Sequence, residues 1–109
     1  MITAKVRIID GKQYIDKLFN ELRIGSISGL RLWPNNDVMI FYTNGVIEIV
    51  TGHDTDVVDL TVYTNNFKNL GIFIDRIIDI VSGIIGKDKF KTEDYIDISI
   101  HSNLNWELI

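Results

Sequence analysis

The chain has 109 residues, of which 46% are hydrophobic and 24% charged, and its formal net charge is −4. This composition excludes an intrinsically disordered chain, and the length predicts one globular domain spanning residues 1–109. The sequence has no cysteine, which excludes disulfides and thiolate chemistry and is typical of a reducing compartment.

The N-terminus and the hydropathy pattern favour a cytoplasmic protein with no membrane partner. The opening residues alternate and carry charges, so they lack the apolar core of a signal peptide. No stretch reaches the roughly 18 uncharged apolar residues that a membrane-spanning helix needs.

A strand and then a helix are predicted for the first 25 residues. Apolar and polar side chains alternate over residues 2–8, which is the pattern of a half-buried strand. Over residues 14–22, apolar side chains recur at spacings of three and four, which predicts an amphipathic helix. Asp10 and Gln13 have the spacing of a capping box at its start, and Gly25 suits its end.

The centre of the chain predicts a meander of antiparallel strands. Residues 30–33, 38–43, 46–51 and 57–64 are apolar or alternating, and turn-forming residues separate them. The pair Asn44-Gly45 is the strongest of these turn signals, because a type I′ hairpin turn needs positive φ at both central positions. We therefore expect a type I′ hairpin there.

A second helix is predicted over residues 67–85, with Asn66 as its N-cap. Its apolar residues cover most of its circumference, which is wider than the stripe that a surface helix normally buries. We expect the first helix and the C-terminal segment to cover the excess. The alternatives are a second copy of the chain, in a homodimer through residues 67–85, and another partner.

The chain then returns to strand periodicity after a charged connector. Ile96, Ile98 and Ile100 alternate with polar residues, and Leu104, Trp106 and Leu108 extend the alternation. The predicted order is β-α-β-β-β-β-α-β. The fold class is therefore α+β, a two-layer sandwich of an antiparallel sheet with a hairpin meander and two helices.

Acidic residues concentrate in a central segment that has no positive charge. No Lys or Arg occurs between Leu32 and Phe67. Such a surface suits a basic protein partner and disfavours direct nucleic-acid binding, which needs cations against the phosphates. Tryptophan is common at interface hot spots. The candidate partner-binding residues are Asp37, Glu48, Asp54, Asp56, Asp59, Trp33 and Trp106.

The sequence carries no motif that predicts catalysis. A phosphate-binding glycine loop, a dinucleotide fingerprint and a nucleophile elbow are all missing. His53 and Asp54 lie in a turn where imidazole and carboxylate could bind a metal, but their spacing matches no standard motif. We predict no catalytic residue, no metal and no cofactor. A small metal-dependent enzyme using His53 and Asp54 is the alternative.

These features together predict a non-enzymatic protein-binding module. Small size, an acidic centre and an apolar helix suggest a phage or mobile-element inhibitor of a host protein, such as a nucleic-acid-processing or defence enzyme. Its carboxylates would then imitate phosphates in a basic groove. The alternative is a toxin-neutralising immunity protein, which would bind its toxin through the same electrostatic attraction.

Overall fold

A six-stranded antiparallel sheet and two helices confirm the predicted fold class and element order. The computed structural model describes residues 1–32, 37–52 and 55–102. The sheet order is β2-β3-β4-β5-β1-β6, so β1 lies between β5 and the last strand. The elements in chain order are β1 (Ile2–Ile8), η1 (Gly11–Tyr14), α1 (Ile15–Leu22), β2 (Ser28–Leu32), β3 (Asp37–Tyr42), β4 (Gly45–Thr51), β5 (Val58–Thr64), α2 (Phe67–Ile85), α3 (Thr92–Tyr95) and β6 (Ile96–Ser102).

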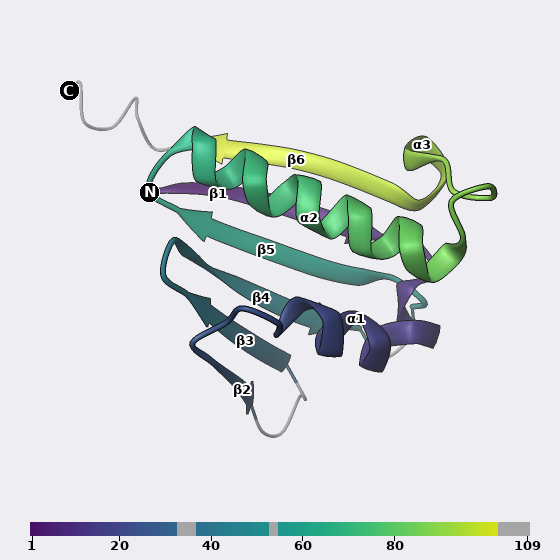
Figure 1. The fold of residues 1–109 in the computed structure, drawn as a ribbon, viewed down its shortest axis with the longest axis horizontal. Coiled ribbons are helices and arrows are strands. Elements are labelled where there is room, and N and C mark those ends of the chain that lie inside the picture. The colour runs from purple at the N-terminus through teal and green to yellow at the C-terminus, as the bar shows by residue number, and fades with distance from the viewer. Residues whose placement is uncertain (33–36, 53–54, 103–109) are drawn as a thin grey trace.

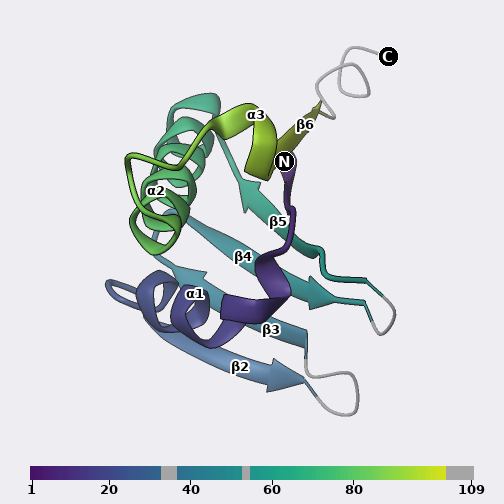
Figure 2. The same cartoon turned by 90° about the vertical axis from the view of Figure 1, so that its right-hand side faces the viewer.

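Both main helices lie on the same face of the sheet. Figure 1 shows α2 over the β5, β1 and β6 half and α1 over the β3 and β4 half. The view turned by 90° shows the helices as one layer and the sheet as the other, with the second sheet face uncovered (Figure 2). No helix in the described part of the chain is long and apolar enough to cross a membrane.

Strand alternation divides the sheet into a buried face and an uncovered one. In β1 the exposure of Ile2, Ala4, Val6 and Ile8 is 4% or less, while Lys5 and Arg7 between them are exposed. The same period holds in β3, β4 and β5, so each strand supplies one apolar row to the helices. Fully burying one such aliphatic side chain is worth about 1.5–3 kcal/mol, and these rows form the core.

The predicted capping box at the first helix is wrong. Asp10 has a left-handed backbone, with φ 59°, and its side chain caps no helix N–H. A 3-10 turn follows instead, and the Lys12 N–H donates to the carbonyl of Asp56 at 3.0 Å. The predicted stop is confirmed, because Gly25 has a positive φ of 81°.

The hairpin at Asn44-Gly45 is confirmed, but its predicted turn type is wrong. Tyr42 pairs with Gly45, so the two loop residues are Thr43 and Asn44. Neither Asn44 nor Gly45 has a positive φ, which excludes type I′. Gly45 is needed for space: a Cβ there would lie 2.5 Å from the Tyr63 carbonyl oxygen and 2.8 Å from the Phe73 ring.

The second helix begins and ends where the sequence places it. The Asn66 side chain accepts a hydrogen bond from the Asn69 N–H at 2.8 Å, as an N-cap should. Most of its apolar residues are buried or packed against the core, the large exceptions being Phe67 (53% exposed) and Ile72 (50%). The sheet and its neighbours thus cover most of the apolar excess.

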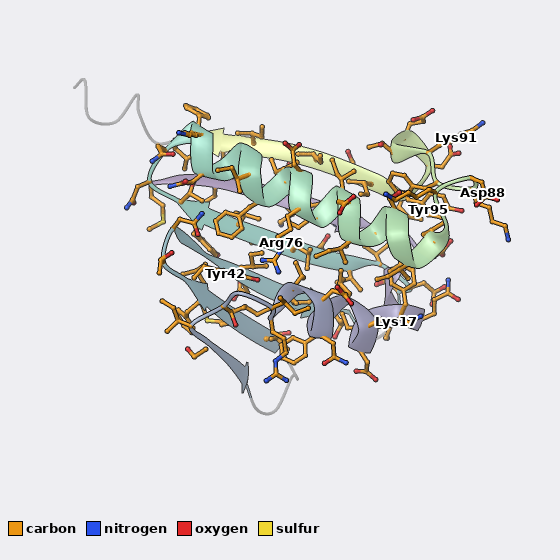
Figure 3. All side chains as sticks on the ribbon, in the orientation of Figure 1. Lys17, Tyr42, Arg76, Asp88, Lys91 and Tyr95 are labelled. Carbon is orange, nitrogen blue, oxygen red and sulfur yellow. The ribbon has the colours of Figure 1, made fainter. Side chains whose placement is uncertain are left out.

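Arg76 and Tyr42 fasten α1 to the rest of the molecule. The Arg76 guanidinium donates to the carbonyls of Glu21, at 3.1 Å, and Ile24, where α1 ends. The buried Tyr42 hydroxyl donates to the Leu22 carbonyl. Figure 3 shows Tyr42 and Arg76 beside each other between the two helices. These donors satisfy the free carbonyls that every helix C-terminus leaves.

The charged connector after α2 contains a short helix that the sequence did not predict. This helix, α3, is a single turn, and no apolar periodicity can mark an element of that length. The Phe90 and Tyr95 rings stack with centroids 5.7 Å apart and join the connector to the start of β6.

Candidate protein-binding face

The sheet face opposite the helices gathers side chains from five strands into one surface. We call it the open face. Residues that lie directly opposite each other on adjacent strands have their side chains on the same face of the sheet. Its members are Thr3, Lys5 and Arg7 of β1, Asp37, Met39 and Phe41 of β3, Val46, Glu48 and Val50 of β4, Asp59, Thr61 and Tyr63 of β5, and Asp97, Ser99 and His101 of β6.

One end of the open face is apolar and aromatic. Phe41 lies opposite Val46, Val46 opposite Tyr63, and Tyr63 opposite Thr3. Phe41, Val46 and Tyr63 are half-buried although no helix covers them, because adjacent aromatic and β-branched side chains shield one another. This aromatic row leaves apolar surface available to a partner.

The other end of the open face is acidic. Asp59 lies opposite Arg7, and Arg7 opposite Asp97, so one cation stands between two carboxylates. Arg7 donates from Nε to Asp59 at 2.9 Å, and this bond, followed by the charge of Asp59, raises the pKa of Arg7. Asp37 begins β3 at the same end of the sheet, and Asp97 is exposed. Carboxylates therefore outnumber cations here.

The middle row of the open face links both ends. Glu48 lies opposite Thr61 and accepts a hydrogen bond from the Tyr63 hydroxyl at 3.3 Å. Burial first, and then the neighbouring Glu48 carboxylate, raises the pKa of Tyr63. Lys5, opposite Thr61 and Ser99, is the second cation of the open face. Its positive charge lies near the β6 side.

The structure brings some of the predicted partner-binding residues together. Asp37, Glu48 and Asp59 all belong to the open face. Asp56 is exposed in the connection before β5, where it lines a hollow of about 170 Å³ with Asp10 and Gln13. The remaining candidates, Trp33, Asp54 and Trp106, lie outside the described residues, as does His53.

The acidic centre of the sequence, which has no Lys or Arg of its own, gains cations from elsewhere when the chain folds. Arg7 reaches Asp59 across 52 positions, and the Lys12 ammonium donates to the Gly52 carbonyl at 2.8 Å. Sequence reasoning also missed Asp97, Phe41 and Tyr63 as members of one surface. Strand alternation contained the signal for their common face, but the strand order that brings them together did not follow from it.

Two open hollows of the described chain lie beside α1. One of about 390 Å³ lies between the helices and is lined by Lys17, Glu21, Asp79, Ile80, Gly83, Ile84 and Lys87. The other adjoins Tyr14, whose buried hydroxyl has no hydrogen-bond partner in the described chain. Charged side chains of both signs line both hollows.

A metal centre has no ligand cluster in the part of the chain that the structure describes. No three His, Cys, Asp or Glu side chains gather there at a separation that would hold an ion. The metal alternative on His53 and Asp54 lies outside that part and stays a prediction.

Comparison with known proteins gives no relative from which a function could be inferred, so the proposal below rests on the geometry of the open face. No model of a protein family matches the sequence, and no curated protein or solved structure is significantly similar to it.

Proposed function

We propose that the protein is a non-enzymatic module that binds a basic surface of another protein through its open face. One observation carries this proposal: a complete sheet face remains uncovered by the helices and combines an aromatic row with an acidic end. Interfaces combine apolar anchors with a polar rim in the same way.

The two ends of the open face would contribute differently to binding. Phe41, Val46 and Tyr63 supply apolar and aromatic area, from which most affinity in protein interfaces comes. Asp37, Glu48 and Asp97 supply negative charge that steers a basic partner and fixes its orientation. Asp59 contributes less, because Arg7 already neutralises it.

Two classes of basic partner fit this surface. A nucleic-acid-processing or defence enzyme of a host presents a basic groove that carboxylates can occupy in place of phosphates. A toxin acting on nucleic acid presents the same kind of groove, and the protein would then serve as its immunity partner. In both cases binding weakens as salt rises, since the exposed charges are screened.

A pair of charge-reversal variants tests the open face. Asp37→Lys with Glu48→Lys reverses two carboxylates on it. Asp75→Lys with Asp79→Lys makes the same change in charge on α2, where both residues are exposed. A partner is isolated from cells of the source with the wild-type protein, purified, and titrated against all three proteins by calorimetry.

The proposal expects the wild type and the α2 variant to bind with equal affinity. The open-face variant should bind at least about tenfold more weakly, because two attractive charge pairs become repulsive. Equal binding by all three proteins, or weakening by the α2 variant alone, would show that the open face is not the binding surface.

A further inference from the structure

The last strand leaves one full edge of the sheet without a partner among the described residues. Among the strands of residues 1–32, 37–52 and 55–102, β6 stands at the end of the sheet order and pairs only with β1 on its inner side. In Figure 1 no helix lies over its outer edge along most of its length. A strand of this length with an unpaired edge is a template for pairing with another chain.

The alternation of hydrogen bonds along β6 shows which of its backbone N–H and C=O groups point away from β1. The Ile9 N–H donates to the Tyr95 carbonyl at 2.9 Å, so residue 95 directs its backbone groups toward β1. The direction alternates along an antiparallel strand. Asp97, Ser99 and His101 therefore bond inward, and the backbone groups of Ile96, Ile98 and Ile100 point to the outer edge.

Apolar side chains accompany this edge on the helix side. Ile100 faces the helix layer but is 53% exposed, because the sheet ends at β6. Phe67, equally exposed, begins α2 at the end of the molecule where β6 finishes (Figure 1). Another protein chain docked along the outer edge of β6 would cover both Ile100 and Phe67.

We propose that β6 pairs with β6 of a second copy of this chain, antiparallel about a two-fold axis at Ser99. This register pairs the whole of Ile96–Ser102 with itself and sets outward-facing backbone groups against each other. It places Ile98 opposite Ile100 of the second copy, which covers the exposed isoleucine. The two sheets join into one.

The same register sets a carboxylate opposite an imidazole on the open face. Asp97 comes opposite His101 of the second copy, and symmetry repeats the pair. Both side chains are exposed in the single chain, so both are accessible to a second copy. An imidazole N–H can donate a hydrogen bond to a carboxylate directly across two strands, whereas like charges placed there weaken the pairing. This interface does not depend on the proposed partner of the open face.

Two isoleucine variants test the position of the interface by light scattering after gel filtration. The wild type should have twice the 12.5 kDa mass of one chain. Ile100→Lys places a charge at the interface and should give single chains. Ile72→Lys changes a residue of the same type and similar exposure (50%) on α2 and should remain dimeric.

Three other results would overturn the β6 interface. These are a single-chain mass for the wild type, a dimeric Ile100→Lys, and dissociation by Ile72→Lys alone. The last result would place self-association on the outer face of α2 instead.

A charge exchange tests the register itself. His101→Asp should raise the dimer dissociation constant about tenfold, because it places two carboxylates opposite each other twice, and Asp97→Lys should raise it because it removes the hydrogen-bond acceptor of His101. The double variant Asp97→Lys with His101→Asp places opposite charges across the interface and should bind at least as tightly as the wild type. The two positions are four residues apart on one strand, too far for a pair within one chain. Additive weakening in the double variant would rule out this register.

Discussion

At Gly45 the sequence correctly predicted a hairpin, but the physical reason for the glycine differs from the predicted one. The pair Asn44-Gly45 marked the hairpin correctly, yet no positive φ is used there. The backbone of β5 and the Phe73 ring come too close to this position for any side chain. Glycine here therefore serves packing between the hairpin and α2 rather than turn geometry.

Replacing this glycine should destabilise the fold. We expect Gly45→Ala to lower the free energy of unfolding by about 1–3 kcal/mol, because the added methyl overpacks a site with no free space. Gly71→Ala is the matched control. A Cβ at Gly71 would meet nothing within 4 Å, so alanine should stabilise α2 by about 1 kcal/mol or less. Urea unfolding of both variants measures the two changes, and an unaffected Gly45→Ala would contradict the close packing.

At the scale of elements, α1 depends on contacts with distant parts of the chain. It has only eight residues, which is too short for a helix to be stable alone in water. Its C-terminal carbonyls receive donors from β3 and α2, through Tyr42 and Arg76. The amphipathic pattern predicted the helix, but not the residues that hold its end.

A double-mutant cycle should reveal this shared attachment. Tyr42→Phe leaves the Leu22 carbonyl without its donor and should cost about 1–3 kcal/mol of unfolding free energy. Arg76→Met should weaken the same helix end. Because both residues fasten the same end of α1, the two costs should differ from additivity by about 0.5 kcal/mol or more. Lys5→Met, on the open face, is the control and should add to Tyr42→Phe without coupling. Strict additivity of Tyr42→Phe and Arg76→Met would contradict a joint role.

Strands and helices were predictable to the extent that their periods are long and regular. The second helix and the strand alternation of β1 and β6 follow directly from their apolar spacing. The Phe90–Tyr95 stack accompanies the single-turn α3, and a hydrogen bond from the Lys12 N–H to the distant Asp56 carbonyl follows the left-handed Asp10. A local apolar pattern contains neither contact. Local periodicity therefore determined the long elements and left the short ones open.

At the scale of the whole molecule, strand order decides which residues share a surface. The acidic centre of the sequence was visible as a run of residues without cations, but β1 inserts between β5 and β6 and brings Arg7 to Asp59. The candidate site could thus be predicted as acidic residues, not as a face with an aromatic row at one end. Long-range pairing of this kind has no signature in local periodicity.

The folded state as a whole should lose stability in alkaline solution through its tyrosines. Burial raises the pKa of Tyr42, with Arg76 opposing the effect. Burial and the charge of Asp10 raise the pKa of Tyr14, and burial and Glu48 raise that of Tyr63. In the unfolded chain each tyrosine ionises at about pH 10. Above that pH the unfolded state binds fewer protons than the folded state.

The tyrosines' contribution to the free energy of unfolding should therefore be fully present below about pH 10. The free energy of unfolding should fall as the pH rises further. The slope is at most about 1.4 kcal/mol per pH unit for each tyrosine that stays neutral only in the folded state. Urea unfolding measured in steps between about pH 8 and 11 gives this slope. Lysines titrate in the same range and are common to all variants, so the difference between wild type and Tyr42→Phe isolates one tyrosine. Tyr42→Phe should start from a lower stability and lose less of it above pH 10. An equal slope in both proteins would show that Tyr42 ionises alike in the folded and unfolded states.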